Sequence, residues 1–341
     1  MKKNYTKKRM SVIIPAYNRA DSLPEVLSKL LSQQKILKDA QVIVVDDGSI
    51  DNTKQLVKEF IENSSVNIRY LYQQNTGAAA ARNLGIKEAQ GEIIFFLDSD
   101  IIPSEALISE HLKFHEKYPQ YNFALRGSTK TSAKQINSVR IVEIGEIEKE
   151  TQKGTNAEYI ELCWADFYSG NISLKRQFLL ENGIFDEEMR TREDIELGYR
   201  LGKRGLKLFY NNKAMGFHLH PVSLQQHLCY AEEYGKSLAI WYSKTPDFKK
   251  DLLKIGRGND CGFLSWKEPL LMIKYFLRIV IVSKFTVKLV IFVGNILKRK
   301  KNNLFRFYYR QAYQYYHRKA FKKHLALIRK GYIQINTRTM V

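Results

Sequence analysis

The chain has few cysteines and no long uncharged apolar run, and both absences exclude classes of protein. Its 341 residues include only three cysteines, Cys163, Cys229 and Cys261, and none of them forms a C-x-x-C pair. A disulfide framework and a thiolate zinc site are therefore excluded, and a reducing compartment is expected. The most apolar segment, residues 270–297, is interrupted by four Lys or Arg side chains. A simple membrane span is therefore not expected.

Acidic residues are nearly absent from the C-terminal part of the chain. From Cys261 to the end there are 18 Lys and Arg residues and one acid, Glu268, which gives this part a charge of +17. The preceding 260 residues carry a charge of only +3 out of the total of +20. The sequence therefore predicts a nearly neutral body with a strongly cationic tail that has a function of its own.

Continuous apolar strands alternate with helices over the first hundred residues. Such alternation indicates an α/β domain with a mostly parallel sheet covered by helices on both faces. Ligands of these sheets bind beyond the carboxyl ends of the strands. The predicted strands are 11–15, 41–45, 68–72 and 92–97, and the predicted helices are 22–33, 53–61 and 78–89.

Polar clusters stand at the ends of three of these strands: Asn18, then Asp46 and Asp47, then Asp98-Ser99-Asp100. Two carboxylates two residues apart can share Mg²⁺ or Mn²⁺, which prefer oxygen ligands. The cation would neutralise a diphosphate leaving group. The alternative is a turn and helix-cap pair with no ligand. In the second cluster, a carboxylate can accept hydrogen bonds from a base or a ribose hydroxyl, or simply cap the next helix.

The predicted helix 78–89 begins with small residues after Gly77, which allow a close backbone approach, and carries Arg82. Arg82 could contact a phosphate or hold the carboxylates. The segment is neither a Walker loop nor a dinucleotide-binding glycine motif. An alanine-rich packed helix with one surface arginine is the alternative.

Two further clusters lie near the end of the expected domain. Glu193 and Asp194 begin a predicted helix, 193–205, where a carboxylate can act as a general base. Solvated first-turn acids are the alternative. His218 and His220 face the same side of an extended segment, and His218 is the favoured metal ligand of the two.

In this order and spacing, the clusters resemble the inverting family 2 glycosyltransferases of the GT-A fold. The resemblance covers roughly residues 10–225 and rests on six or seven motifs in register. These motifs are 12–18, 45–49, Asn75 and Gly77 with 81–83, 98–100, Gly170 and Asn171 with Ser173, 185–187, and Glu193 with Asp194.

The resemblance implies a metal-dependent transfer from an NDP-sugar, a UDP-sugar being expected, onto a glycan or lipid-linked acceptor. Asp194 would deprotonate the acceptor, with Glu193 beside it, and Gly170 and Asn171 would line the sugar and acceptor pocket. The metal, Mg²⁺ or Mn²⁺, would be bound by Asp100 and Asp98, and the residues themselves add His218 as a candidate ligand. The implied donor-binding residues are Pro15, Tyr17, Asn18, Asp46, Asp47, Gly77, Arg82, Asp98 and Ser99.

The sequence also departs from the processive members of that family. It contains no Gln-x-x-Arg-Trp segment, which cellulose and hyaluronan synthases carry. We therefore expect addition of one or a few sugars, in the synthesis of a cell-surface polysaccharide or glycoconjugate. Two other functions remain open on the residues alone: a basic nucleic-acid-binding protein and a nucleotidyltransferase that uses the same nucleotide-binding sheet.

The division expected from the sequence is a catalytic domain at 1–225, a helical connector at 226–265 and a cationic amphipathic helical region at 266–341. On a helix, the basic residues of 270–297 fall on one side and the apolar residues on the other, as in helices that lie in a membrane interface. Tyrosines mixed with Arg and Lys follow in 305–323. We expect this region to bind an anionic membrane surface, and so a peripheral protein on the cytoplasmic face of the cell membrane. Packing against protein and binding of single-stranded nucleic acid are the alternatives, the latter the least favoured.

Overall fold

The computed structural model describes residues 9–131, 157–219, 224–245, 247–254 and 303–335. By its contacts the chain divides into two units. The first comprises 1–136, 140–187 and 193–221, and the second comprises 137–139, 188–192 and 222–341. The domain boundaries expected from the sequence stay a prediction.

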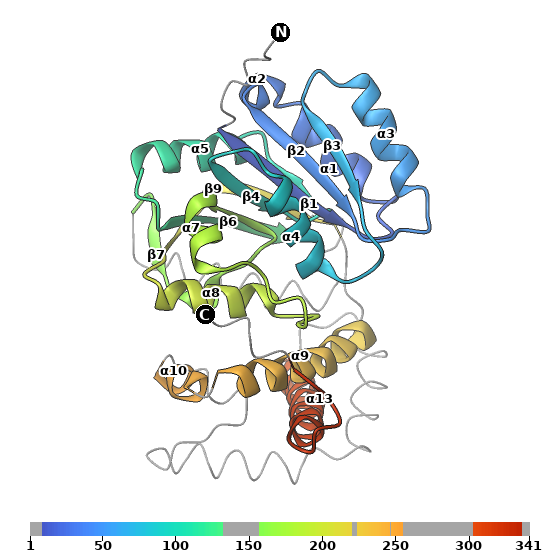
Figure 1. Ribbon diagram of the computed structural model, residues 1–341, viewed down its shortest axis with the longest axis vertical. Coiled ribbons are helices and arrows are strands. Elements are labelled where there is room, and N and C mark those ends of the chain that lie inside the picture. Colours follow the sequence, from blue (N-terminus) through green and yellow to red (C-terminus); the bar gives the residue numbers. More distant parts are fainter. Residues whose placement is uncertain (1–8, 132–156, 220–223, 246, 255–302, 336–341) are drawn as a thin grey trace. The chain divides into compact units, whose positions relative to one another are not determined.

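The first unit is built on one sheet, which has nine strands in the described residues (Figure 1). Its strand order is β3-β2-β1-β4-β8-β6-β9-β5, and β7 also pairs with β9. The strands are β1 (Met10–Ala16), β2 (Ala40–Asp46), β3 (Ile68–Tyr72), β4 (Ile93–Leu97), β5 (Ile101–Pro103), β6 (Phe123–Thr131), β7 (Ile160–Leu162), β8 (Asn171–Lys175) and β9 (Lys207–His218).

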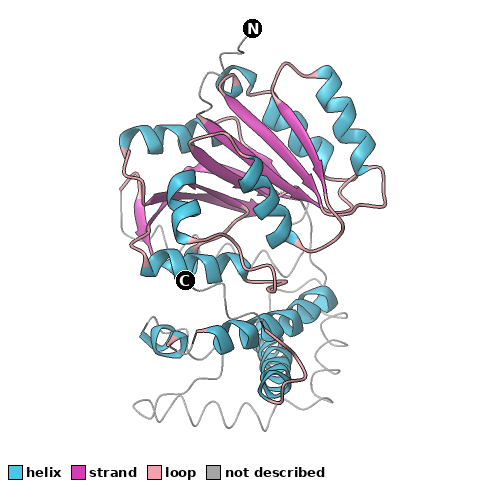
Figure 2. Ribbon diagram, in the orientation of Figure 1, coloured by secondary structure: helices cyan, strands magenta, loops and turns pink. Residues whose placement is uncertain are grey.

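Helices cover both faces of this sheet, which confirms the predicted α/β class (Figure 2). Successive residues of β1 point to opposite faces, so Val12 and Ile14 belong to one core and Ile13 to the other. The first core contains side chains of α1 (Leu23–Leu31), α2 (Gln34–Leu37), α3 (Thr53–Asn63) and α5 (Leu107–Lys117). The second contains side chains of α4 (Ala78–Glu88), α7 (Arg176–Asn182) and α8 (Glu193–Lys203).

The sheet is parallel in one half and mixed in the other. Strands β3, β2, β1 and β4 are parallel, and all four lie within two residues of their predicted bounds. Beyond β4 the pairs are antiparallel, except β6 with β9. Strand β9 continues to His218, and a register shift between Gly127 and Ser128 lets it pair along all of β6.

A buried polar network ties α5 to β8. The ring of His111 contacts Ser173 Oγ at 2.8 Å and Asn171 Oδ1 at 2.9 Å, and His115 Nε2 contacts the same Ser173 oxygen at 2.9 Å. The Asn171 amide donates to the backbone oxygens of Ser128 and Ala214. The amide thus bridges β6 and β9 where their register shifts.

This network predicts loss of stability in mild acid. Burial lowers the pKa of His111 from 6.5 to about 4, so the unfolded chain binds a proton that the folded chain excludes. The contribution of neutral His111 to the free energy of unfolding is complete above pH 6.5 and is lost as the pH falls toward 4. At pH 5 the free energy of unfolding is lower by ~2 kcal/mol. The pKa of His115 is also lowered, chiefly by burial. Hydrogen exchange of the β8 amides in urea at pH 7.5 and 5.0 measures the loss. His111→Gln should reduce it, and an equal loss in wild type and variant would contradict the assignment.

The second unit is helical. Its elements are α9 (Leu224–Lys244), α10 (Phe248–Lys254) and α13 (Asn303–Arg329). Helix α13 packs on α9: the ring of Tyr313 lies 6.3 Å from that of Tyr234, and Phe321 lies 6.0 Å from Tyr242. Gly235 has no side chain where α9 meets the backbone of His317, and a Cβ there would clash. This part of the tail therefore packs against protein.

No helix in the described residues is both long enough and apolar enough to cross a membrane. The amphipathic helix expected at 270–297 and His220 lie outside the described residues.

Candidate active site

The carboxyl end of β4 carries the first acidic cluster. All five residues of β4 are buried, and the next residue, Asp98, donates its backbone N–H to the Gly170 oxygen at 3.1 Å. This bond joins the end of β4 to the residue before β8. Ser99 is buried, and the Asp98 side chain is 25% exposed. Asp98 therefore lies at the carboxyl end of a central strand, with its side chain partly exposed to solvent.

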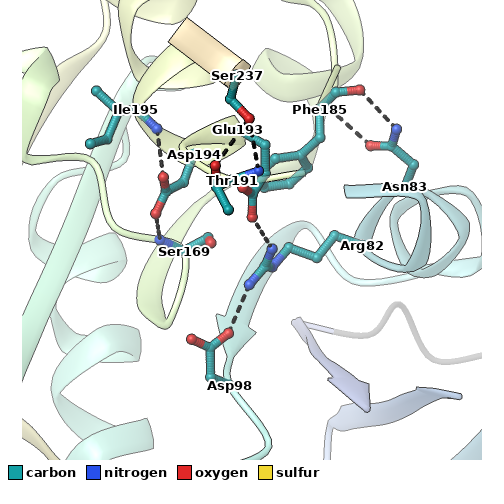
Figure 3. Close-up of polar contacts among 10 residues, drawn as sticks. All are labelled: Arg82, Asn83, Asp98, Ser169, Phe185, Thr191, Glu193, Asp194, Ile195 and Ser237. Atoms are coloured by element: carbon teal, nitrogen blue, oxygen red, sulfur yellow. Dashed lines mark hydrogen bonds and ion pairs between the residues drawn. The ribbon is translucent and has the colours of Figure 1, made fainter. Parts of the chain in front are cut away.

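Arg82 of α4 connects this cluster to the second pair of acids. Its guanidinium donates to Asp98 Oδ1 and to Glu193 Oε1, both at 2.8 Å (Figure 3). The side chain is 6% exposed, so these are buried ion pairs. Of the two roles weighed for Arg82, contact with phosphate or with carboxylates, the structure shows the second.

Asp194 lies beside Glu193 in the first turn of α8. Asp194 accepts backbone N–H groups of Ser169 at 3.3 Å and of Ile195 at 2.8 Å (Figure 3). Burial is the main reason why the pKa of both carboxyls is raised, and repulsion by Asp194 adds to the rise for Glu193. The charge of Arg82 opposes both rises. A carboxylate with a raised pKa is suited to accept a proton near neutral pH.

Asp100 lies opposite His218. Because β5 pairs with β9 and Ile101 is in register with His218, the imidazole Nε2 lies 3.7 Å from Asp100 Oδ1. Arg19 Nη2 lies 3.5 Å from the other carboxylate oxygen. Asp98, the third predicted ligand, is bound to Arg82.

The described residues contain no group of three or more His, Cys, Asp or Glu side chains that could by itself hold a metal ion. Asp100 and His218 nevertheless offer a carboxylate and an imidazole, a donor set that suits Mn²⁺. The pair fits a cation that takes its remaining ligands from substrate oxygens and water.

The loops after β1 and β2 hold each other in place. Asn18, in the left-handed region at φ 51°, donates its backbone N–H to Ser49 Oγ, and its side-chain oxygen accepts the N–H of Ile50. Pro15 is half-buried at the end of β1, and Tyr17 is 47% exposed. Of these residues, the Tyr17 side chain is free to meet a ligand.

Asp46 and Asp47 are buried and bonded within the protein. Asp46 accepts the Tyr70 hydroxyl at 2.6 Å. Asp47 accepts the N–H groups of Thr76 at 2.9 Å and Gly77 at 2.8 Å, and so fixes the start of α4. Gly77 has φ 108°, which favours glycine. These contacts position the loop that leads to Arg82.

The predicted sugar pocket consists of two residues with different surroundings. A Cβ at Gly170 would lie 2.5 Å from the Tyr168 ring and 2.7 Å from Asp98 Oδ2, so a side chain there would displace Tyr168 and Asp98. Asn171 is fully buried and its amide is used in the network with His111. Its side chain therefore supports the sheet beneath Gly170.

Asn83 belongs to the motif at 81–83 but not to the predicted site residues. Its side-chain amide accepts the N–H of Phe185 and donates to the Phe185 oxygen (Figure 3). It also donates to the carboxylate of Glu187. Two consecutive residues of α4 thus hold the region around α8: Arg82 binds Glu193 at its start, and Asn83 binds the segment 185–187 that precedes it. An Arg-Asn pair in an alanine-rich helix was the available signal, and the fold alone reveals the partners.

Comparisons with known proteins agree with this geometry. The family model described as glycosyl transferase family 2 matches residues 11–181. Chondroitin synthase of Escherichia coli is 28% identical over 275 residues, which cover 72% of this chain and 40% of that protein. Validoxylamine A glucosyltransferase of Streptomyces hygroscopicus subsp. jinggangensis is 26% identical, over 61% of this chain and 54% of the relative. The chain thus spans about half or less of the length of these relatives.

Solved structures share the fold. A mannosyltransferase from Pyrobaculum calidifontis, solved with GDP-Man and Mn²⁺, has a TM-score of 0.63 at 19% identity, over 94% of this chain and 88% of that one. S. aureus TarS 1-349 has a TM-score of 0.50 at 17% identity, over 95% and 92%. The predicted GT-A fold is confirmed. Because the family model covers half of the chain, including the clusters at the ends of β1, β2 and β4, the chain belongs to glycosyl transferase family 2.

Proposed function

We propose that the chain is an inverting glycosyltransferase that uses an NDP-sugar, with a UDP-sugar as the expected donor. The observation that carries the proposal is the buried link from Asp98 through Arg82 to Glu193 and its neighbour Asp194. This link connects the carboxyl end of β4 with two carboxyl groups whose pKa values are raised. Ligands of such sheets bind beyond the carboxyl ends of the strands. The GDP-Man in the mannosyltransferase and the UDP-GlcNAc in a TarS complex support a nucleotide-sugar donor.

In the proposed reaction Asp194 accepts the proton of the acceptor hydroxyl. The hydroxyl oxygen forms a bond to the anomeric carbon while the bond from that carbon to the diphosphate oxygen breaks, and the NDP leaves from the opposite face. Attack opposite the leaving group inverts the configuration. Arg82 holds Glu193 beside the base. A divalent cation bound by Asp100 and His218, near Asp98, would neutralise the diphosphate.

The donor would lie along the ends of β1, β2 and β4. Tyr17 has the exposed side chain that could contact a base, and Gly170, which packs against Tyr168 and Asp98, would line the sugar pocket. Pro15, Asn18, Asp46, Asp47, Gly77 and Ser99 would shape the loops around it.

A panel of UDP- and GDP-sugars with Mn²⁺ tests this function. Release of nucleoside diphosphate from one of them, lost with EDTA and greatly reduced in Asp100→Ala, is the expected result. Release that is unchanged by EDTA and by Asp100→Ala would remove the metal role. Absence of release from every sugar, with glycan and lipid-linked acceptors present, would contradict the donor class.

We also propose that the enzyme adds one or a few sugars to a glycan or lipid-linked acceptor of the cell surface, and that α13 binds an anionic membrane. Five exposed basic residues fall within an arc of about 120° on α13 and its end, opposite the face that packs on α9. They are Lys319, Lys322, Lys323, Arg329 and Lys330. Because Tyr313 contacts Tyr234 within the unit, the basic residues are the better candidates for headgroup contact.

Binding of the full chain to lipid vesicles tests the proposal that α13 binds an anionic membrane. Each basic residue near an anionic leaflet contributes ~1 kcal/mol, so replacing Lys319, Lys322, Lys323 and Lys330 by Gln should weaken binding to phosphatidylglycerol vesicles about 100- to 1000-fold. Gln at the exposed Lys54 and Lys58 of α3 is the control and should change it little. Equal binding by wild type and the α13 variant would contradict the proposal. Deleting the tail is a poorer test, because it would uncover the face of α9 that α13 covers.

A further inference from the structure

The five residues before the catalytic acids belong to the second unit. Segment 188–192 groups with α9, and the chain then passes directly into Glu193. Three kinds of contact join the segment to α9, spaced along the helix at Tyr234, Ser237 and Lys244.

Each contact involves a different interaction. The Arg192 guanidinium lies 5.0 Å from the centre of the Tyr234 ring, a cation–π distance. The Thr191 hydroxyl lies 3.0 Å from Ser237 Oγ, and its N–H donates to the same oxygen at 3.3 Å (Figure 3). Glu188 pairs with Lys244 at 3.0 Å.

These contacts are buried on the helix side. Ser237 is 2% exposed, and the Lys244 side chain is 1% exposed. A buried ammonium is costly unless it is paired, and the pair with Glu188 offsets part of the cost of burying Lys244. Specific polar contacts therefore hold segment 188–192 against α9.

Arg192 has φ 59°, in the left-handed region that non-glycine residues seldom adopt. Such a backbone persists where the surroundings hold it in place, and residues of this kind gather at functional sites. Here the neighbours on α9 hold both Thr191 and Arg192. The strained residue is also the last one before the acids.

We propose that α9 positions the catalytic carboxylates by holding 188–192, with Tyr234, Ser237 and Lys244 as positioning residues. None of the three touches the reacting atoms. A rotation at Arg192 would redirect the first turn of α8, where Asp194 bonds the Ser169 N–H and Glu193 bonds Arg82. This inference rests on the proposed role of Asp194 as the base.

Kinetics of the full chain test it with the nucleotide sugar that the wild type turns over. Tyr234→Leu should lower kcat by about 10- to 100-fold, because a small misplacement of a catalytic group is enough. The donor KM should change by less than about twofold, since the donor residues lie on other elements. Tyr242→Leu is the matched control: it is on the same helix but contacts Phe321 of α13, and kcat should stay at the wild-type value. Equal effects of the two variants would overturn the proposal.

Rescue separates positioning from general damage to the helix. Glycine adopts positive φ without strain, so Arg192→Gly should restore much of the kcat lost in Tyr234→Leu. Absence of rescue would overturn the role assigned to the Arg192 backbone.

Hydrogen exchange distinguishes failure of this inference from failure of the proposed function. Tyr234→Leu should speed exchange of the amides at 193–196, and Tyr242→Leu should not. If Asp194→Asn keeps its activity, the proposed base is wrong whatever the exchange shows. If Asp194→Asn is inactive and Tyr234→Leu is normal in both rate and exchange, only the role of α9 is wrong.

Discussion

Asp194→Asn is expected to lower kcat about 10²- to 10⁴-fold, the contribution typical of a well-placed general base. Asparagine has nearly the same shape, and its single amide oxygen can still accept one of the two N–H groups, from Ser169 or from Ile195, that the carboxylate accepts through separate oxygens. It cannot take the proton of the acceptor. The loss should therefore appear in kcat, with the donor KM close to that of the wild type.

The control for Asp194→Asn is Asp186→Asn, which also changes a buried acid that precedes α8 but lies outside the proposed machinery. It should reduce kcat far less. Equal losses in the two variants would mean that any buried acid here supports the fold, and that Asp194 is not the base.

The second large effect is expected from Arg82→Met. The substitution leaves Asp98 and Glu193 without the cation that they share in a buried place, and removal of one partner of such a pair costs ~3–5 kcal/mol. Arg69→Met is the matched control, because Arg69 pairs with Glu88 at the surface, where an ion pair contributes only ~0–1 kcal/mol. Thermal and urea unfolding of the two variants measure these losses in the free energy of unfolding, and the loss should be larger for Arg82→Met.

Arg82→Met should also move the pH dependence of turnover. The charge of Arg82 opposes the rise in the pKa of Glu193 and Asp194. Without that charge the pKa values rise further, by about 1–3 units. The base must be ionised to act, so the acidic limb of kcat/KM should shift to higher pH by a similar amount. An unshifted limb would show that these carboxyls do not control it.

The first half of the sheet could be predicted because most of its strands contain a continuous run of apolar residues. Strands β1 and β4 read as short runs of Val, Ile and Phe between helical patterns, and the chain order places their ends together. The placement of the acids at those ends follows from this pattern, whereas the class of reaction came from the resemblance of the motifs to family 2 glycosyltransferases.

The region from β5 to α7 could not be predicted in the same way. Strand β6 contains Gly127, Ser128 and Thr129, which do not resemble a buried strand. The buried Asn171 amide bridges the backbone there, and its partner His111 looks like a polar residue on a helix. Pairings between such distant residues leave no local signal in the sequence.

Two features of the site also needed three-dimensional structure. The sequence offered Asp46 and Asp47 as donor-binding residues, and the structure adds that the oxygens of Asp47 hold the backbone at Thr76 and Gly77. The left-handed Arg192 has no signature, because non-glycine residues adopt such a backbone only through their neighbours.

The configuration of the product at its anomeric carbon tests the central claim most directly. Proton NMR of the product formed from an α-linked UDP- or GDP-sugar reads that configuration from the anomeric coupling. A β-linked product, whose formation stops in Asp194→Asn, is predicted, because one base and one departing diphosphate act on opposite faces of the sugar. An α-linked product, or one formed equally well without the Asp194 carboxylate, would contradict the account.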